Sequence, residues 1–167
     1  SGNSIPGPEF DHWNIAIIEK GLFGGTCLNV GCIPSKMFVY AADVAEVIRG
    51  SSTYGIQAKI EGVDWPGIRD RVFGRIDPIV QGGEEYRLGV ECPNITVFKG
   101  TGRLVGEKTL EVIDNDGQAA RVSGRHIVLG AGARPFIPSY PGLDQVPFHT
   151  SDTIMRIDSL PQRMIIL

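Results

Sequence analysis

The 167-residue chain is poor in the residues that build metal centres and disulfide-rich folds, with only 3 cysteines and 3 histidines. The histidines, His12, His126 and His149, do not combine with a cysteine at metal-ligand spacing, which argues against a metal site. Apolar runs such as residues 15–18 and 164–167 are far too short to span a membrane, and no signal peptide is visible. A net charge of -3 gives no basic surface for nucleic acid. We therefore expect a cytoplasmic protein without metal, membrane or nucleic-acid partners.

The composition is sufficient for one domain with a core, because 42% of the residues are hydrophobic and 21% are charged. Two cysteines lie close together in the sequence and the third, Cys92, lies apart. This odd number with a close pair is typical of a reducing compartment, where a disulfide is catalytic and transient. Cys92 precedes Pro93 and is expected to be a buried bystander thiol.

The close pair, Cys27 and Cys32, is suited to redox exchange and poorly suited to stabilising the fold. A bridge between them would close a six-residue loop, which the loop-entropy estimate values at ~2 kcal/mol, against ~4 for one joining distant parts of a domain. On a regular helix the two Cα atoms would lie ~8.6 Å apart, beyond the ~7 Å reach of a disulfide. The segment must therefore bend, and Asn29 and Gly31 tolerate such backbone. Two ordinary buried cysteines are the alternative.

A helix is predicted to follow Cys32, because apolar residues recur at helical spacing until Gly50. Pro34 suits its first turn. Cys32 would lie at the helix N-terminus, where the macrodipole and Lys36 favour a thiolate.

Other segments indicate a mixed α/β domain. Residues 14–19 form a short apolar run typical of a buried parallel strand, and residues 126–129 repeat that pattern. Residues 64–88 are helical in pattern, but Pro78 predicts two helices or a kink near Asp77. Residues 95–98, 103–105, 109–113 and 119–122 alternate with turn signals such as Asn115-Asp116-Gly117, which predicts an antiparallel meander. The stretch from residue 130 to residue 160 is rich in proline and glycine and is expected to be irregular.

Residues 24–36 read GGTCLNVGCIPSK, and this run resembles the redox-active segment of the flavoprotein pyridine-nucleotide disulfide oxidoreductases. Residues 37–45 and 71–79 are more similar to the mycothione reductases of that family than to lipoamide dehydrogenase or glutathione reductase. The resemblance covers essentially the whole chain.

The resemblance implies an FAD-binding, Rossmann-like parallel sheet with a small antiparallel meander inserted at about residues 95–122. Residues 24–36 would carry the redox-active disulfide, and an NAD(P)-binding domain would start at about residues 163–167. In the family a first strand and a glycine loop precede the counterpart of Glu19. Ser1 and Gly2 resemble the tail of that loop, with Asn3 in place of its last glycine. We therefore expect residues 1–167 to be a partial FAD-binding domain whose first strand is missing.

Glu19 ends the first predicted strand, where a carboxylate can bind the two hydroxyls of an adenosine ribose; a solvated acid at a strand end is the alternative. Gly24, Gly25 and Thr26 lack bulk and supply backbone N–H groups, as a loop passing a pyrophosphate or flavin must. In the family, the counterpart of Lys36 stabilises the reduced flavin. Ala131 and Ala133 replace a threonine and a serine of the family's turn near the FAD, so only backbone contacts carry over there. The expected cofactor-binding residues are Glu19, Lys20, Gly24, Gly25, Thr26, Cys27, Cys32, Lys36, Thr101, Gly102, Ala131, Gly132 and Ala133.

The activity implied is that of a homodimeric, FAD-dependent and NADPH-driven reductase of a small-molecule disulfide such as mycothione. Cys27, Cys32 and Lys36 would be the catalytic residues, with the Cys32 thiolate beside the flavin and Cys27 attacking the substrate. The family's general base, a histidine near the C-terminus of the partner subunit, has no counterpart here, so the isolated chain is expected to be inactive. His149 and Asp152 are expected to be structural. Lipoamide dehydrogenase, an FAD-binding module without disulfide turnover and an inactive fragment remain alternatives.

Overall fold

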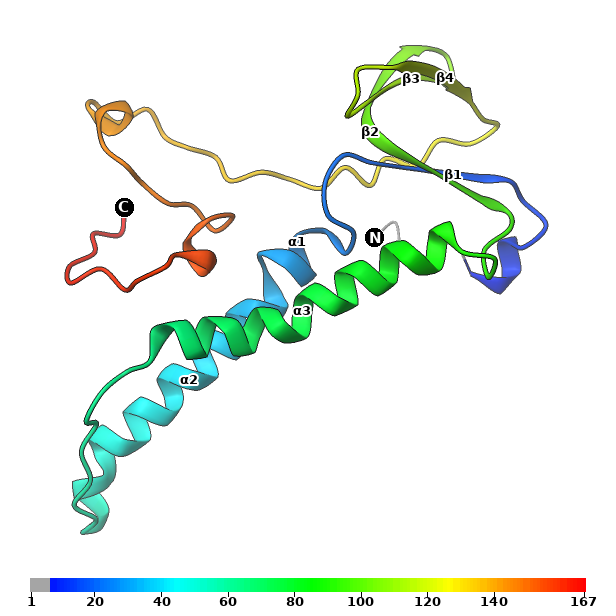
Figure 1. Ribbon diagram of the computed structural model, residues 1–167. Coiled ribbons are helices and arrows are strands. Elements are labelled where there is room, and N and C mark those ends of the chain that lie inside the picture. Colours follow the sequence, from blue (N-terminus) through cyan, green and yellow to red (C-terminus); the bar gives the residue numbers. More distant parts are fainter. Residues whose placement is uncertain (1–6) are drawn as a thin grey trace. The chain divides into compact units, whose positions relative to one another are not determined.

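The structure, a computed structural model, describes residues 7–167 and divides the chain into two compact units. Of the described residues, one unit comprises 7–25 together with Ile79–Gly132, and the other comprises Thr26–Pro78 together with Ala133–Leu167. Figure 1 labels their helices and strands. The expectation for Ser1, Gly2 and Asn3 lies outside the described residues.

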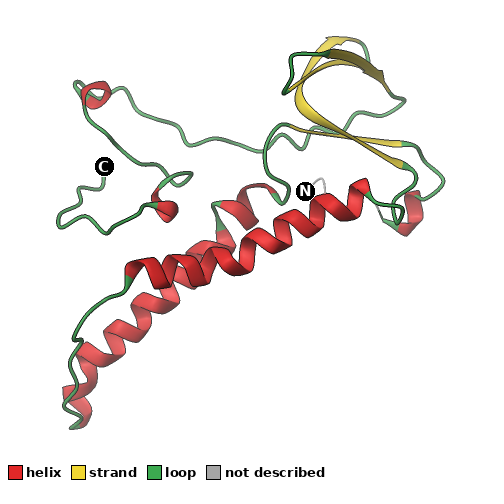
Figure 2. Ribbon diagram, in the orientation of Figure 1, coloured by secondary structure: helices red, strands yellow, loops and turns green. Residues whose placement is uncertain are grey.

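The first unit contains a four-stranded sheet of mixed direction. Its strands are β1 (Ile15–Glu19), β2 (Ile95–Gly106), β3 (Thr109–Asp114) and β4 (Ala119–Ser123), in the order β1-β2-β3-β4. β1 and β2 are parallel, whereas β2, β3 and β4 pair antiparallel (Figure 2). The predicted parallel strand and the predicted meander are both confirmed, as is the α/β class.

Strand β2 merges two segments that were predicted to be separate strands. Gly100, Thr101 and Gly102 read as a turn in the sequence but continue the ladder, opposite Asp114, Ile113 and Val112 of β3. A Cβ atom on Gly100 would lie 2.8 Å from the Cα of Asp114 and closer still to the carbonyl oxygen of Ile113. Glycine is therefore present because the neighbouring backbone comes too close for a side chain.

The turn between β3 and β4 forms as predicted. Gly117 has φ +82°, a conformation that favours glycine. The carboxylate of Asp114 accepts hydrogen bonds from the N–H groups of Asp116 (3.0 Å) and Gln118 (2.7 Å).

The predicted strand at residues 126–129 is wrong, because these residues are irregular and Val128 and Leu129 are 63% and 74% exposed. A strand needs a neighbour for its hydrogen bonds, and no described strand pairs with this segment. Strand β1 also has few neighbours, because among the described strands it pairs with β2 alone. It is therefore half-buried, although the sequence predicted a buried strand.

The helices are α1 (Gly25–Asn29), α2 (Cys32–Gly50) and α3 (Trp65–Leu88). The prediction of α2 is confirmed. Pro78 lies inside α3 without ending it, so the prediction of two helices is wrong. Proline removes one backbone hydrogen bond, and burial of Ile76 and Val80 before and after it favours continuing the helix. None of the described helices is long and apolar enough to cross a membrane.

In the second unit, α2 packs against the first half of α3. Phe38 of α2 stacks on Trp65 at 5.2 Å between ring centroids and contacts Phe73, and Val72 and Ile76 are almost fully buried. This aromatic contact fixes the two helices side by side.

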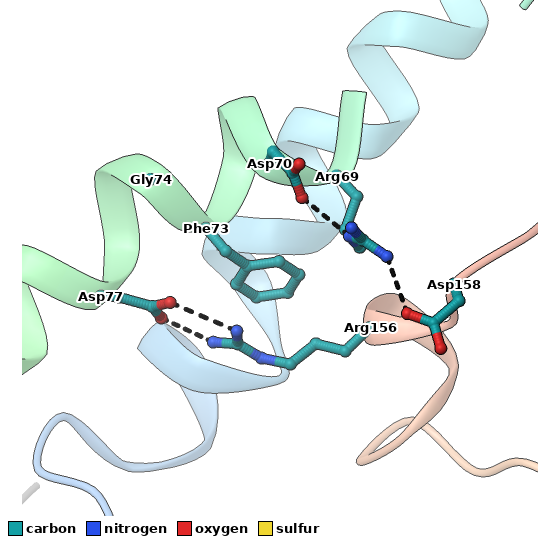
Figure 3. Close-up of a pocket in the computed structure, with 7 residues that line it drawn as sticks. All are labelled: Arg69, Asp70, Phe73, Gly74, Asp77, Arg156 and Asp158. Atoms are coloured by element: carbon teal, nitrogen blue, oxygen red, sulfur yellow. Dashed lines mark hydrogen bonds and ion pairs between the residues drawn. The ribbon is translucent and has the colours of Figure 1, made fainter. Parts of the chain in front are cut away.

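The irregular segment that follows residue 132 is tied to α3 by arginines, as Figure 3 shows. Arg69 pairs with Asp158 at 3.1 Å, and Arg156 pairs with Asp77 at 2.6 Å while lying 3.6 Å from the ring centroid of Phe73. These residues line a groove of about 360 Å³. Each guanidinium is already paired with a carboxylate, so its charge is neutralised. We therefore interpret these arginines as structural contacts and not as an anion-binding site.

Candidate redox-active site

Cys27 and Cys32 lie on either side of a break between two helices. Cys27 belongs to α1, Cys32 is the first residue of α2, and Val30 and Gly31 separate the two helices. Both cysteines are exposed free thiols. The predicted bend is therefore confirmed, and the alternative of two buried cysteines is wrong.

Gly31 permits this close approach. A Cβ atom on residue 31 would lie 2.7 Å from the carbonyl oxygen of Thr26 and 3.1 Å from the Cα of Cys27. Both atoms are backbone, so neither can move aside as a flexible side chain would. The sequence indicated Gly31 as a tolerant residue, and the structure adds that its missing side chain lets the start of α2 contact α1.

The two thiols interact directly. The pKa of Cys27 is raised from its ordinary value, chiefly because its thiol hydrogen bonds with the side chain of Cys32, with desolvation and the charge of Cys32 adding to the effect. The backbone N–H groups of Cys32 and Ile33 act in the opposite direction, because they stabilise the Cys27 thiolate. The N-terminus of α2 is thus directed at the sulfur of Cys27, which the sequence did not predict.

Removing the Cys32 side chain should make Cys27 more acidic. In reduced Cys32→Ala protein the raising interactions are lost while the backbone N–H groups remain, so the Cys27 thiolate should form at lower pH. The rate of Cys27 alkylation by iodoacetamide, followed against pH by peptide mass spectrometry, should then have a lower midpoint than in the wild type. Cys92→Ala is the matched control and should leave the midpoint unchanged. A midpoint that stays the same or rises in Cys32→Ala would contradict this assignment.

The second unit also holds three more of the predicted site residues. Lys36 is exposed on α2, four residues after Cys32, and Thr26 is exposed on α1. Ala133 lies in the irregular segment that follows residue 132 and is exposed. The structure thus brings Thr26, Cys27 and Cys32 together at one helix junction.

In the first unit, Glu19 ends β1 and its side chain is already oriented. Its Oε1 accepts a hydrogen bond of 2.8 Å from the N–H of Gly21. Lys20 is exposed beside it. Gly24 and Gly25 have φ values of +102° and +65°, and a Cβ on Gly25 would meet nothing within 4 Å. The space beside Gly25 is therefore open at the point where a cofactor was predicted.

Thr101 and Gly102 lie on β2, just beyond the end of its pairing with β1. A Cβ on Gly102 would lie 3.2 Å from the side chain of Ile18, so this glycine also has a packing role within the sheet. Ala131 and Gly132 are exposed in irregular structure, and Gly132 has φ +72°.

The sequence did not identify Lys99 as part of this region. Its ammonium lies 3.2 Å from the carbonyl oxygen of Gly21, 2.8 Å from a carboxylate oxygen of Glu84 and 5.2 Å from the ring centroid of Phe23. Lys99 lies opposite Glu19 in the parallel pairing of β1 and β2. This register cannot be predicted from the sequence, so Lys99 was not identified.

The remaining candidate residues have structural partners. Cys92 is buried, as predicted, and its thiol raises the pKa of Tyr86 by hydrogen bonding with the tyrosine hydroxyl. His149 contacts the hydroxyl of Thr153 at 3.2 Å, which agrees with the predicted structural role. Within residues 7–167, no group of three or more His, Cys, Asp or Glu side chains is arranged as a metal site.

Comparison with known proteins places this geometry in context. A model of the family "Pyridine nucleotide-disulphide oxidoreductase" matches residues 10–167. Mycothione reductase of Mycobacterium tuberculosis is 48% identical over 170 residues, which cover 100% of this chain and 36% of that protein. Mercuric reductase of Streptomyces lividans is 34% identical over 158 residues, covering 92% of this chain and 32% of that enzyme. The chain thus spans about a third of the length of these curated relatives.

The fold itself matches a solved structure. The HOCl-induced flavoprotein disulfide reductase RclA from Escherichia coli superposes with a TM-score of 0.71 at 24% identity, over 90% of this chain and 30% of that one. Its Cu(II) complex gives a TM-score of 0.73 over the same shares. At this identity the match bears on the fold alone.

Proposed function

This chain belongs to the pyridine nucleotide-disulphide oxidoreductase family, and on that premise we propose that it is the part of an FAD-dependent disulfide reductase that carries the redox-active cysteine pair. The observation that supports this most directly is the contact between the exposed thiols of Cys27 and Cys32 across a helix break. Two thiols close enough to hydrogen bond are suited to thiol–disulfide exchange, and their exposure leaves them open to a substrate.

The proposed exchange uses only these two thiols. The Cys27 thiolate attacks one sulfur of a disulfide RSSR, forming a Cys27–SR mixed disulfide and releasing one RS⁻. The Cys32 thiolate then attacks the sulfur of Cys27, which releases the second RS⁻ and leaves a Cys27–Cys32 disulfide. Two electrons pass from the protein to the substrate, and each released thiolate takes up one proton. This division is the one that the family resemblance implies. The N–H groups of Cys32 and Ile33 stabilise negative charge on Cys27, but the hydrogen bond with the Cys32 side chain outweighs them and leaves the pKa of Cys27 raised.

Bound FAD would supply the two electrons that reduce this disulfide again. The donor set of the first unit suits its adenosine and pyrophosphate parts. Glu19 offers a carboxylate for a ribose diol, and a side chain at Gly25 would meet no neighbour, so the backbone can be approached closely there. We also propose Thr26, Lys36 and Ala133 of the second unit as cofactor-binding residues of the whole enzyme. The same is proposed for Thr101, Gly102, Ala131 and Gly132 of the first unit.

Mycothione is the substrate we propose, with NADPH as the electron donor of the whole enzyme. Identity of 48% to mycothione reductase over the whole chain, against 34% to mercuric reductase over most of it, supports this choice. Assaying the full-length protein with mycothione and NADPH against reduced lipoamide and NAD tests this choice. A preference for the lipoamide couple would favour the alternative.

The proposal predicts that the protein binds FAD and that reduction by two electrons produces a long-wavelength absorption band from the Cys32 thiolate lying against the flavin. Cys32→Ser should abolish this band because serine carries no thiolate at neutral pH. Absorption spectra recorded during an anaerobic dithionite titration report both the bound FAD and the long-wavelength band.

Cys27→Ser is the matched control, since it removes a thiol from the same junction and leaves Cys32 in place. It should retain the band while losing disulfide exchange. A band that persists in Cys32→Ser would overturn the assignment of Cys32, and a protein that takes up no FAD would overturn the proposed function.

A further inference from the structure

Lys99 makes its contacts with the loop that follows β1. In the parallel register of β1 and β2 it lies opposite Glu19, the last residue of β1. Its ammonium donates a hydrogen bond to the carbonyl oxygen of Gly21 at 3.2 Å. Lys99 thus connects one strand to the turn that leaves its neighbour.

The peptide groups of Gly21 connect Lys99 to Glu19. The N–H of Gly21 donates to Oε1 of Glu19 at 2.8 Å, while the carbonyl of the same residue accepts from Lys99. The carbonyl and the N–H belong to adjacent peptide groups that share the Cα of Gly21, so a hydrogen bond on the carbonyl limits the conformations open to the turn that carries the N–H. The orientation of the Glu19 carboxylate therefore depends on Lys99, because both side chains hydrogen bond to the backbone of Gly21.

Lys99 is itself held by two further contacts. Its ammonium pairs with Glu84 of α3 at 2.8 Å and lies over the ring of Phe23, with 5.2 Å to the centroid. The Lys99 and Glu84 side chains are only 34% and 27% exposed, so the pair is shielded more than an ordinary surface ion pair. The ring of Phe23, which belongs to the same loop, is buried. These contacts hold the Lys99 ammonium in one position. The loop after β1 contacts it at two points, the carbonyl of Gly21 and the ring of Phe23.

From this chain of contacts we infer that Lys99 is a positioning residue for the adenosine end of the dinucleotide, acting through Gly21 to hold Glu19 in the orientation that accepts a ribose diol. The inference rests on the proposed function, because it takes Glu19 as the ribose ligand. Lys99 does not contact the ligand in this role. Its contribution is to limit the orientations that the Glu19 carboxylate adopts before the ligand binds.

Replacing Lys99 with methionine tests the inference, since methionine keeps the length of the apolar stem and removes the donor. Losing a charged hydrogen bond that orients a ligand should weaken FAD binding by about tenfold. FAD fluorescence titration of the full chain measures the dissociation constant, and thermal unfolding of the same samples reports stability. Lys99→Arg retains a charged donor and should restore most of the affinity.

A double-mutant cycle with Glu19→Gln separates positioning from a general structural effect. If Lys99 acts through Glu19, the double variant should bind FAD no more weakly than Glu19→Gln alone. If the two losses simply multiply, Lys99 acts independently of Glu19 and the inference is overturned. FMN, which lacks the adenosine half, provides a second readout, and Lys99→Met should leave FMN binding unchanged.

Glu84→Gln is the control for the ion pair, because it removes the charge beside Lys99 and leaves the contact with Gly21. It should lower FAD affinity much less than Lys99→Met. A wild-type chain that binds FAD together with a Lys99→Met variant that binds it equally well contradicts the inference alone. A wild type that binds no FAD contradicts the proposed function and the inference with it.

Discussion

Replacing Gly31 with alanine should drive the cysteine pair apart and make its disulfide markedly easier to reduce. The added methyl group would lie 2.7 Å from the carbonyl oxygen of Thr26 and 3.1 Å from the Cα of Cys27. Relief of that overlap must come from the helix break itself and costs about 1–3 kcal/mol. The closed disulfide needs the closest approach, so it bears most of the penalty. We expect the reduction potential of the pair to rise by about 30 mV or more, which is about tenfold in the equilibrium with a reference dithiol.

Equilibration in glutathione buffers, followed by alkylation and mass spectrometry of the Cys27–Cys32 peptide, measures this potential. Gly50→Ala is the matched control, because Gly50 ends α2 and a Cβ there would meet nothing within 4 Å. The two variants make the same chemical change at opposite ends of one helix. Equal potentials in Gly31→Ala and Gly50→Ala would show that the approach of the thiols does not depend on residue 31.

A second large effect is expected at Gly100, where an alanine should destabilise the sheet by about 3 kcal/mol. Its Cβ would lie 2.8 Å from the Cα of Asp114 and closer to the carbonyl of Ile113, both in the backbone of β3. Neither atom can yield without separating the two strands. Urea unfolding followed by far-ultraviolet circular dichroism gives the free energy of unfolding.

Gly106→Ala controls for the loss of glycine in the same strand. Its Cβ would be 3.8 Å from the nearest atom, the Cβ of Thr109, which is an ordinary contact. The free energy of unfolding should change by about 0.5 kcal/mol or less. A similar loss in both variants would mean that the close approach of β3 to Gly100 does not set the cost of the substitution.

Local signals predicted much of this structure. On a regular helix, two cysteines five residues apart are too far from each other to form a disulfide. A break in the helix between Cys27 and Cys32 could therefore be predicted from the sequence. The apolar spacing before Gly50 predicted α2, and the Asn115-Asp116-Gly117 turn predicted the β3–β4 hairpin. Each of these inferences needs only residues that are neighbours in the chain.

Predictions failed where the outcome depends on a distant segment. Gly100 and Gly102 read as a turn, because nothing nearby reveals that β3 would pass close to one and Ile18 close to the other. Val128 and Leu129 read as a strand, although strand formation depends on a partner. Pro78 predicted two helices or a kink, because burial of Ile76 and Val80, which favours one continuous helix, is not visible in the sequence.

The residues of the candidate site differ in the same way, since some could be predicted from local sequence and others depend on distant segments. Residue type and spacing indicated Cys27, Cys32 and Glu19. The contacts of Lys99 with Gly21 and Glu84 join segments more than ten residues apart, so no spacing rule finds them. The direction of the α2 N–H groups toward Cys27 depends on the geometry at Gly31, which is equally invisible to periodicity.

The pairing of β1 with β2 has a consequence for how the chain folds. Ile15 meets Ile95 across eighty residues of sequence, whereas β2, β3 and β4 are joined by short turns. Closing so long a loop carries a larger entropic penalty and slows folding. The hairpins should therefore assemble first and accept β1 last. The two cysteines lie inside that long loop yet are only five positions apart, so the reactive pair can form and be oxidised before the sheet is closed.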